Sequence, residues 1–202
     1  MNSVLQVLGI LIILGIYVSI VMYFRKQRAW LTYYLFASFG LVLILVLGLQ
    51  LTGLEKYIEY GQMNLVKYLS QPFGIGIAAL SPTTIQVNDS IGWVVLTMGI
   101  ESSALIEASI LIALVSFYPA YGMSKKVRYL TIGLFVTFVA NIIRIFIIVS
   151  MTHFMGRETI FISHAIVGRL FFFLCIIILF WYIFTRPTIE EVSEIIRGEN
   201  IV

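Results

Sequence analysis

Five long apolar runs constrain the fold of this chain more than any other feature. They cover residues 4–24, 30–51, 103–119, 129–151 and 160–184. A helix of roughly 20 residues crosses the hydrocarbon core of a bilayer. Of the 202 residues, 60% are hydrophobic and only 11% are charged, a composition far from that of a soluble domain. The sequence therefore predicts an all-α polytopic membrane protein, a single transmembrane domain over 1–202 with about five transmembrane helices.

Clusters of basic residues between these runs predict the orientation of the chain. They lie at 25–28, at 125–128 and at Arg186, after the first, third and fifth runs. Because basic residues concentrate in cytoplasmic loops, these sites are expected inside. We expect a multi-pass plasma-membrane protein with its N-terminus outside and a short cytoplasmic tail over 186–202. The first run has no basic start and no small-residue cleavage site, so it is expected to remain as a helix. Because the orientation of the chain in the membrane explains these basic residues, no nucleic-acid partner is predicted.

Residues 52–101 form an insertion, here called the cap, that this orientation places outside the membrane. Residues 54–69 repeat apolar positions at helical spacing, which predicts an amphipathic helix on the outer leaflet. Residues 71–100 are rich in turn formers and predict a hairpin or an irregular segment. Within them, 91–100 is expected to extend the third helix outward or to re-enter the membrane. In the tail, Thr188 and Glu191 have the spacing of a capping box that opens a short helix.

Polar residues within or beside the apolar runs carry the functional information, because each is costly in a membrane unless it is paired or hydrated. The motifs of common soluble enzymes are absent. With 1.5 Å of rise per residue, three helices are expected to bring a hydroxyl, a guanidinium and an imidazole together beneath the cap. The candidate catalytic residues are Ser102, Arg144 and His164, and the candidate supporting residues are Glu101, Ser103, Glu107, Asn141 and Arg169.

Structural explanations compete with a functional one for several of these side chains. Ser102 and Ser103 could be small residues that let helices approach closely. Glu107 could form a buried ion pair with Arg144 or with Arg169. Asn141 precedes Arg144 by three residues and could orient its guanidinium.

The remaining thiol and imidazole are not expected to react. Cys175 falls deep in an apolar run, where a thiolate is disfavoured, so it is not the predicted nucleophile. His153 is expected to be a hydrogen-bonded loop residue. One cysteine and two histidines cannot form a disulfide framework or a closed zinc site, and no cofactor or metal ion is predicted.

Three blocks of sequence resemble the motifs of the exosortase/archaeosortase family, closest to the Gram-positive exosortase G type. They are Gly-Ile-Glu-Ser-Ser-Ala at 99–104, Asn-Ile-Ile-Arg at 141–144 and His-Ala-Ile-Val-Gly at 164–168. The resemblance implies a membrane-embedded cysteine peptidase or transpeptidase. Its partner would be a membrane-anchored protein substrate with a C-terminal sorting signal. Carried over by position, the catalytic triad is residue 102, where the family has cysteine, with Arg144 and His164.

This chain has serine at the position of the family's nucleophile. Serine needs a well-aligned base, whereas a thiol ionises readily beside a cation. Two hypotheses explain this serine. It is a Cys→Ser substitution introduced to inactivate the enzyme, or it belongs to a natural variant that uses serine or no covalent chemistry. The intact surrounding motif favours the first. The expected mechanism is acyl transfer at the outer face, with His164 shuttling the proton and Arg144 stabilising the thiolate or oxyanion. The resemblance also implies that the acceptor is an amine or hydroxyl of a lipid or a glycan.

Two other classes of function compete with the enzyme. One is a non-catalytic binding or assembly partner for the export of surface protein or exopolysaccharide. The other is a small transporter that uses Glu107, Arg144 and Arg169 as a charge relay. The absence of an inverted repeat or matching interrupted spans disfavours the transporter.

Overall fold

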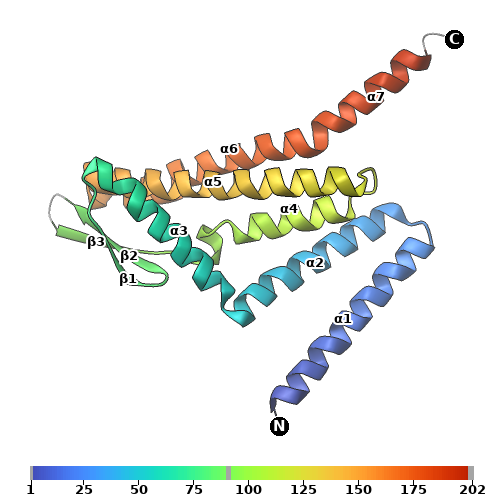
Figure 1. Cartoon of the computed structure of the whole chain (residues 1–202), viewed down its shortest axis with the longest axis horizontal. Helices are drawn as coiled ribbons and strands as arrows, with labels where there is room; N and C mark the ends of the chain where they lie inside the picture. The colour runs from blue at the N-terminus through green and yellow to red at the C-terminus, as the bar shows by residue number, and fades with distance from the viewer. Residues whose placement is uncertain (1, 90–91, 200–202) are drawn as a thin grey trace.

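The computed structural model describes residues 2–89 and 92–199, and most of them are helical. Long helices form a bundle with a small sheet at one end (Figure 1). The helices are α1 (Asn2–Lys26), α2 (Trp30–Thr52), α3 (Leu54–Ser70), α4 (Leu105–Phe117), α5 (Met123–Met155), α6 (Gly168–Phe180) and α7 (Arg186–Glu199). Short helical turns adjoin them at η1 (Gln71–Phe73), η2 (Ile100–Ser102), η3 (Arg157–Thr159), η4 (Ile162–Val167) and η5 (Trp181–Thr185).

Three helical stretches of the described chain are long and apolar enough to cross a membrane. They are Trp30–Thr52, Met123–Met155 and Arg157–Glu190. Their length and hydropathy follow from the same leucine-, isoleucine- and phenylalanine-rich runs that stand out in the sequence. The chain is therefore a mostly helical membrane protein.

The third apolar run forms a shorter helix than expected. The sequence predicts a span over 103–119, whereas α4 has only 13 residues and is about 20 Å long. Its start is delayed because Ala104 adopts a left-handed backbone conformation, with φ of 59°. Its end precedes Pro119, which disfavours a helical conformation at the residue before it. Both changes leave α4 enclosed by longer neighbours, with Leu111 and Ala113 fully buried.

The cap combines the expected helix with a three-stranded sheet, in which β1 and β2 form a hairpin of the kind the sequence predicts and only the third strand was not expected. Helix α3 covers the residues predicted to be amphipathic. After it come β1 (Ile77–Ser81), β2 (Thr84–Asp89) and β3 (Gly92–Thr97), antiparallel in the order β1-β2-β3. The predictions that 91–100 extends the third helix or re-enters the membrane are wrong, and the all-α class needs this small sheet added. The reason is tertiary, since an apolar segment with two adjacent valines, Val94 and Val95, could form a helix or a strand and here pairs with β2.

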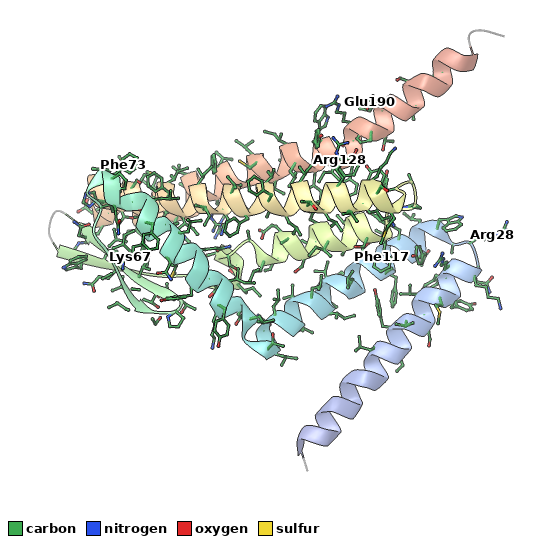
Figure 2. The ribbon with its side chains drawn as sticks, in the orientation of Figure 1. Arg28, Lys67, Phe73, Phe117, Arg128 and Glu190 are labelled. Carbon is green, nitrogen blue, oxygen red and sulfur yellow. The ribbon has the colours of Figure 1, made fainter. Side chains whose placement is uncertain are left out.

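Helix α3 and the inner face of the sheet bury their apolar side chains against α5. The core there consists of Met63, Val66, Ile75, Ile77, Ile85, Val87, Met98, Ile142, Ile145 and Val149. At the opposite end of the bundle, α4, α5 and α6 enclose a second core of Leu111, Val115, Tyr121, Leu179 and Ile183. Figure 2 shows side chains filling the space between these helices.

The C-terminal tail continues the last long helix without a break. The sequence predicts that Thr188 caps a separate helix, but Thr188 Oγ1 donates a hydrogen bond of 2.8 Å to the carbonyl of Phe184, one turn back. That bond belongs to a helix interior and not to an N-cap. Helix α7 is also held by an Arg186–Glu190 ion pair at 2.8 Å. The capping-box prediction is therefore wrong.

Candidate active site

Ser102 lies in a sharp connection between the sheet and α4. The Ser102 N–H donates to the carbonyl of Gly99 at 2.8 Å, and Ser103 Oγ donates to the carbonyl of Ile100 at 2.8 Å. Ala104 then takes the left-handed conformation, which costs a non-glycine residue about 1 kcal/mol. No side chain caps the N-terminus of α4. The turn thus places Ser102 three residues before the first residue of α4, a helix N-terminus that no side chain caps.

Arg144 is buried in the middle of the protein on α5. Only 5% of it is exposed, and its guanidinium lies over the ring of Phe172 at 5.4 Å from the ring centre. Its Nε has no hydrogen-bond partner. A cation held this way is expensive, because the aromatic face replaces only part of its hydration. Such a side chain is available to an anionic group that enters the site.

His164 lies on a π-helical turn, η4, at the start of the last long helix. π-Turns are rare and often occur at functional sites. Gly168 ends this turn, and a Cβ there would lie 2.9 Å from the carbonyl oxygen of Ser163 and 3.0 Å from the side chain of Ile148. A glycine is therefore needed for η4 to pack this closely on α5. The sequence predicts His164 as a site residue but not the π-turn that carries it.

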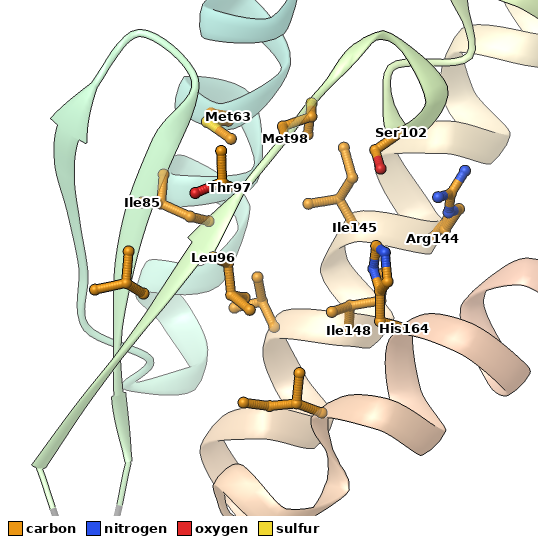
Figure 3. Close-up of a pocket in the computed structure, with 13 residues that line it drawn as sticks. Met63, Ile85, Leu96, Thr97, Met98, Ser102, Arg144, Ile145, Ile148 and His164 are labelled. Atoms are coloured by element: carbon orange, nitrogen blue, oxygen red, sulfur yellow. The ribbon is translucent and has the colours of Figure 1, made fainter.

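Ser102, Arg144 and His164 line both of two adjoining cavities. The first, about 180 Å³, is mostly apolar and lies between β3 and α5. The second, about 370 Å³, is lined in addition by Glu101, Glu107, Arg169 and Phe172. Figure 3 shows the three side chains converging from η2, α5 and η4. A bound molecule could thus place an apolar portion on one side of the three residues and a polar portion on the other.

The charged supporting residues do not form the ion pairs that a purely structural role predicts for them. In the part of the chain that the structure describes, no ion pair within 4.0 Å joins Glu107 to Arg144 or to Arg169. Glu107 Oε2 is buried and has no hydrogen-bond partner, while Glu101 and Arg169 are exposed. These groups therefore surround a polar cavity without neutralising one another by direct contact.

Asn141 takes part in a hydrogen-bonded chain that differs from the expected contact with Arg144. Its Nδ2 donates to Gln62 Oε1 at 3.1 Å, and Gln62 Nε2 donates to the carbonyl of Ser103 at 3.0 Å. All three residues are at most 2% exposed. The chain links α5 through α3 to the turn that carries Ser102. Sequence reasoning missed Gln62, although a polar residue on the apolar stripe of an amphipathic helix is a signal that could have found it.

The other two candidate groups, His153 and Cys175, line neither cavity. His153 is hydrogen-bonded as predicted, through Nδ1 to the carbonyl of Asn88 at 2.8 Å, and so joins α5 to the sheet. The prediction that it lies in a loop is wrong, because α5 continues to Met155. Cys175 is half-buried and packs near Ala104, Ala140 and Phe172. Within residues 2–89 and 92–199, no group of three His, Cys, Asp or Glu side chains is placed to hold a metal ion.

No protein-family model, curated protein or solved structure matches this chain. The features that indicate a function are therefore the three short blocks of sequence and the geometry of the site. That site combines a hydroxyl, an imidazole and a buried guanidinium, which are the groups needed for nucleophilic attack, proton transfer and charge stabilisation.

Proposed function

We propose that this site carries out acyl transfer of the exosortase type, cleaving a C-terminal sorting signal from a membrane-anchored protein. One observation supports this above the others: Ser102, Arg144 and His164 come from three separate elements and share the walls of two cavities. A structural role for each residue does not require that they meet at the same cavities.

The roles follow from the chemistry of each group. The side chain of residue 102 attacks the substrate carbonyl while His164 removes its proton. His164 then gives this proton to the departing amine. The amine leaves together with the membrane anchor, and the rest of the substrate stays bound to residue 102 as an acyl enzyme. Arg144 stabilises the negative charge on the tetrahedral oxygen, and the uncapped N–H groups of α4 add to this. An amine or hydroxyl of a lipid or glycan then accepts the acyl group.

The proposal includes five membrane crossings and a site at the outer face. Helices α1 and α4 would add two crossings to the three long spans, with α4 extended by the turns on either side of it. Arg28 and Arg128 lie at the end of the bundle away from the sheet, opposite Lys67 and Phe73 of the cap (Figure 2). Since basic residues favour the cytoplasmic side, this separation supports an external cap and an external site.

Serine at position 102 supports a second candidate, a non-catalytic partner that binds a protein tail or a lipid in the same cavities. A site that suits a thiolate is expected to work poorly with a hydroxyl. The two candidates differ in whether residue 102 reacts, and this is what the experiment measures.

The test compares thiols introduced at neighbouring positions. Ser102→Cys and Ser103→Cys are each made in a Cys175→Ala background and treated in intact cells with a membrane-impermeant maleimide. Ser102 is partly exposed to both cavities, whereas Ser103 is 1% exposed and provides the matched buried control. We expect fast labelling of the Ser102→Cys thiol from outside, and slower labelling when His164→Ala is added. A fluorophosphonate probe on the unsubstituted chain tests whether Ser102 itself is reactive.

Two positions calibrate sidedness in this assay. Leu80→Cys lies on the exposed sheet and Met123→Cys at the other end of the bundle, and both residues are well exposed. Labelling of Leu80→Cys but not of Met123→Cys establishes an external cap. A Ser102→Cys thiol that is inert, or that is unaffected by His164→Ala, would contradict the acyl-transfer proposal and favour the binding partner.

A further inference from the structure

The apolar cavity beside Ser102 runs along the edge of strand β3. Four consecutive residues, Val95 to Met98, line it. Because successive side chains of a strand point to opposite faces, a cavity touched by all four must lie along the strand's edge. Figure 3 shows this part of the chain passing from Leu96 through Met98 toward Ser102.

The hydrogen-bond register shows which backbone groups face that edge. The Met98 N–H donates to the carbonyl of Thr83 at 2.7 Å, and Leu96 lies opposite Ile85 in the same ladder. Directly opposite residues in an antiparallel pair alternate between bonded and non-bonded pairs. Leu96 and Val94 therefore bond to β2, whereas the N–H and C=O groups of Val95 and Thr97 point away from it.

This edge is open within the described part of the chain. The sheet has three strands with β3 at one side, and no strand of residues 2–89 or 92–199 pairs with its outer edge. No backbone hydrogen bond involving Val95 or Thr97 is formed outside the β2–β3 ladder in those residues. Proteins usually protect such an edge with charges, proline or a covering segment. Here the edge faces a cavity instead.

The wall opposite this edge is apolar and leads to the three site residues. It is formed by Ile145, Ile148 and Val149 of α5, with Ile160 nearby. An extended peptide would thus find hydrogen-bonding groups on one side and apolar contacts on the other. A lipid chain could use the apolar wall but could not satisfy the N–H groups of Val95 and Thr97.

We propose that an extended segment of the protein substrate binds along β3 as a fourth strand and so presents its next peptide bond to Ser102. The segment exchanges backbone hydrogen bonds with Val95 and Thr97, as in other cases of strand addition. Alternate side chains of the segment face the wall of α5, so apolar residues are selected at every second position. This inference rests on the proposed function and assigns its substrate-binding surface.

The experiment measures amide hydrogen exchange by NMR on the full chain in detergent micelles. The probe is an acetylated pentapeptide of alternating threonine and valine, with a C-terminal dodecylamide that holds it at the micelle surface. Two further forms carry N-methyl groups on either the valine or the threonine amides. Only the amides that face β3 are needed for pairing, so one methylated form is expected to bind and the other is not.

The expected result is selective protection of the open edge. The unmethylated probe and one methylated form slow exchange at Val95 and Thr97 by about tenfold or more, as for amides newly placed in a ladder. Val94 and Leu96, already bonded to β2, serve as internal controls and change little. Equal effects of both methylated forms, no effect at Val95 and Thr97, or protection that depends only on protein concentration would each overturn the proposal, the last by showing that a second copy covers the edge.

Failure of this inference is distinguishable from failure of the proposed function. If Ser102→Cys is reactive but the edge stays unprotected, acyl transfer stands and strand addition is refuted. If the edge is protected but the thiol is inert, the chain binds an extended peptide without reacting with it.

Discussion

The two ends of the helical bundle are packed in opposite ways. At the end formed by the α4–α5 turn, Tyr121 packs against Tyr118 and Tyr129 with ring centres 4.5 Å and 5.0 Å apart, and its hydroxyl donates to the carbonyl of Ile183. At the end beneath the cap, Glu107 Oε2, Asn141 Oδ1 and Arg144 Nε are buried without hydrogen-bond partners. Both cavities that adjoin the three candidate catalytic residues are at this second end.

This difference in packing suggests that one end of the bundle mainly stabilises the fold and that the other end holds the candidate site. Buried polar atoms in folded proteins nearly always have partners, because an unpaired group costs about 1–3 kcal/mol. Two of the three atoms belong to Glu107 and Arg144, which line the cavities, and packing alone does not explain why they are left unpaired there. We therefore expect substitutions beneath the cap to change reactivity more than stability. Substitutions at the end formed by the α4–α5 turn, where the tyrosines pack, are expected to change stability more than reactivity.

The largest expected effect on reactivity is from Arg144→Gln in the Ser102→Cys background. Loss of the cation makes the thiolate less favourable, so labelling is expected to slow by about tenfold or more at neutral pH. The midpoint of thermal unfolding is expected to change little or to rise, since the cost of burying a charge is removed. Arg128→Gln, an exposed arginine at the other end, is the control. Equal labelling in the two variants would contradict a role for Arg144.

The largest expected effect on stability is from Leu111→Ala, at the end of the bundle formed by the α4–α5 turn. Leu111 is fully buried and would lie 2.5 Å from a Cβ built at Gly133, which shows how closely α4 and α5 pack. Truncating it is expected to lower the free energy of unfolding by about 2–5 kcal/mol. Labelling of the Ser102→Cys thiol should not change. Leu47→Ala, at an exposed position of α2, should be nearly neutral.

Gln62→Leu is expected to change both stability and reactivity, because Gln62 links α3 to the turn beside Ser102. Breaking this link is expected to cost about 1–3 kcal/mol of unfolding free energy and to slow labelling of the Ser102→Cys thiol. Adding Asn141→Leu removes the unpaired amide and should recover part of the stability. Labelling should stay slow in the double variant. If reactivity recovered together with stability, Gln62 would have only a structural role.

The smallest effect is expected at Glu59 on α3, which is 2% exposed and has one carboxylate oxygen without a partner. Burial raises the pKa of Glu59 above its usual value of 4.5; nearby Glu55 adds to the rise, and Lys56 opposes it. The folded state therefore holds this proton at pH values where the unfolded chain has released it. Stability is expected to fall as pH rises from 4.5 through the raised pKa.

Thermal unfolding between pH 4 and 8 measures this dependence. Glu59→Gln should flatten the profile, because an amide carries no titrating proton. Glu55→Gln, at a more exposed position, should flatten it less. A profile that is the same in Glu59→Gln and in the unsubstituted chain would exclude Glu59 as its cause.

Much of the helical framework could be predicted from local hydropathy. The run 30–51 became α2, 129–151 lies within α5, and the three-and-four spacing of 54–69 became α3. Each of these helices depends on residues close in sequence, and the spacing of their apolar side chains predicts a helix directly. The sequence also singled out Ser102, Arg144 and His164, which the fold brings to the same two cavities. Their catalytic role remains a prediction.

Other features depended on contacts between residues far apart in the chain. The run 92–97 became a strand because β2 supplied its hydrogen-bonding partners, although its hydropathy suited a helix equally well. Thr188 remained inside a helix because the last span continued through it. Asn141 bonded to Gln62, 79 residues away, and not to the neighbouring turn of its own helix.

The sequence by itself determined that the chain is a helical membrane protein and which polar residues it must accommodate, since hydropathy and cost of burial are properties of single residues and short segments. Only the tertiary structure decided how those residues meet. The π-turn under His164, the link through Gln62 and the open edge of β3 all depend on packing between separate elements. Packing of this kind is set by shape and hydrogen-bond geometry across the whole molecule, which no local pattern encodes.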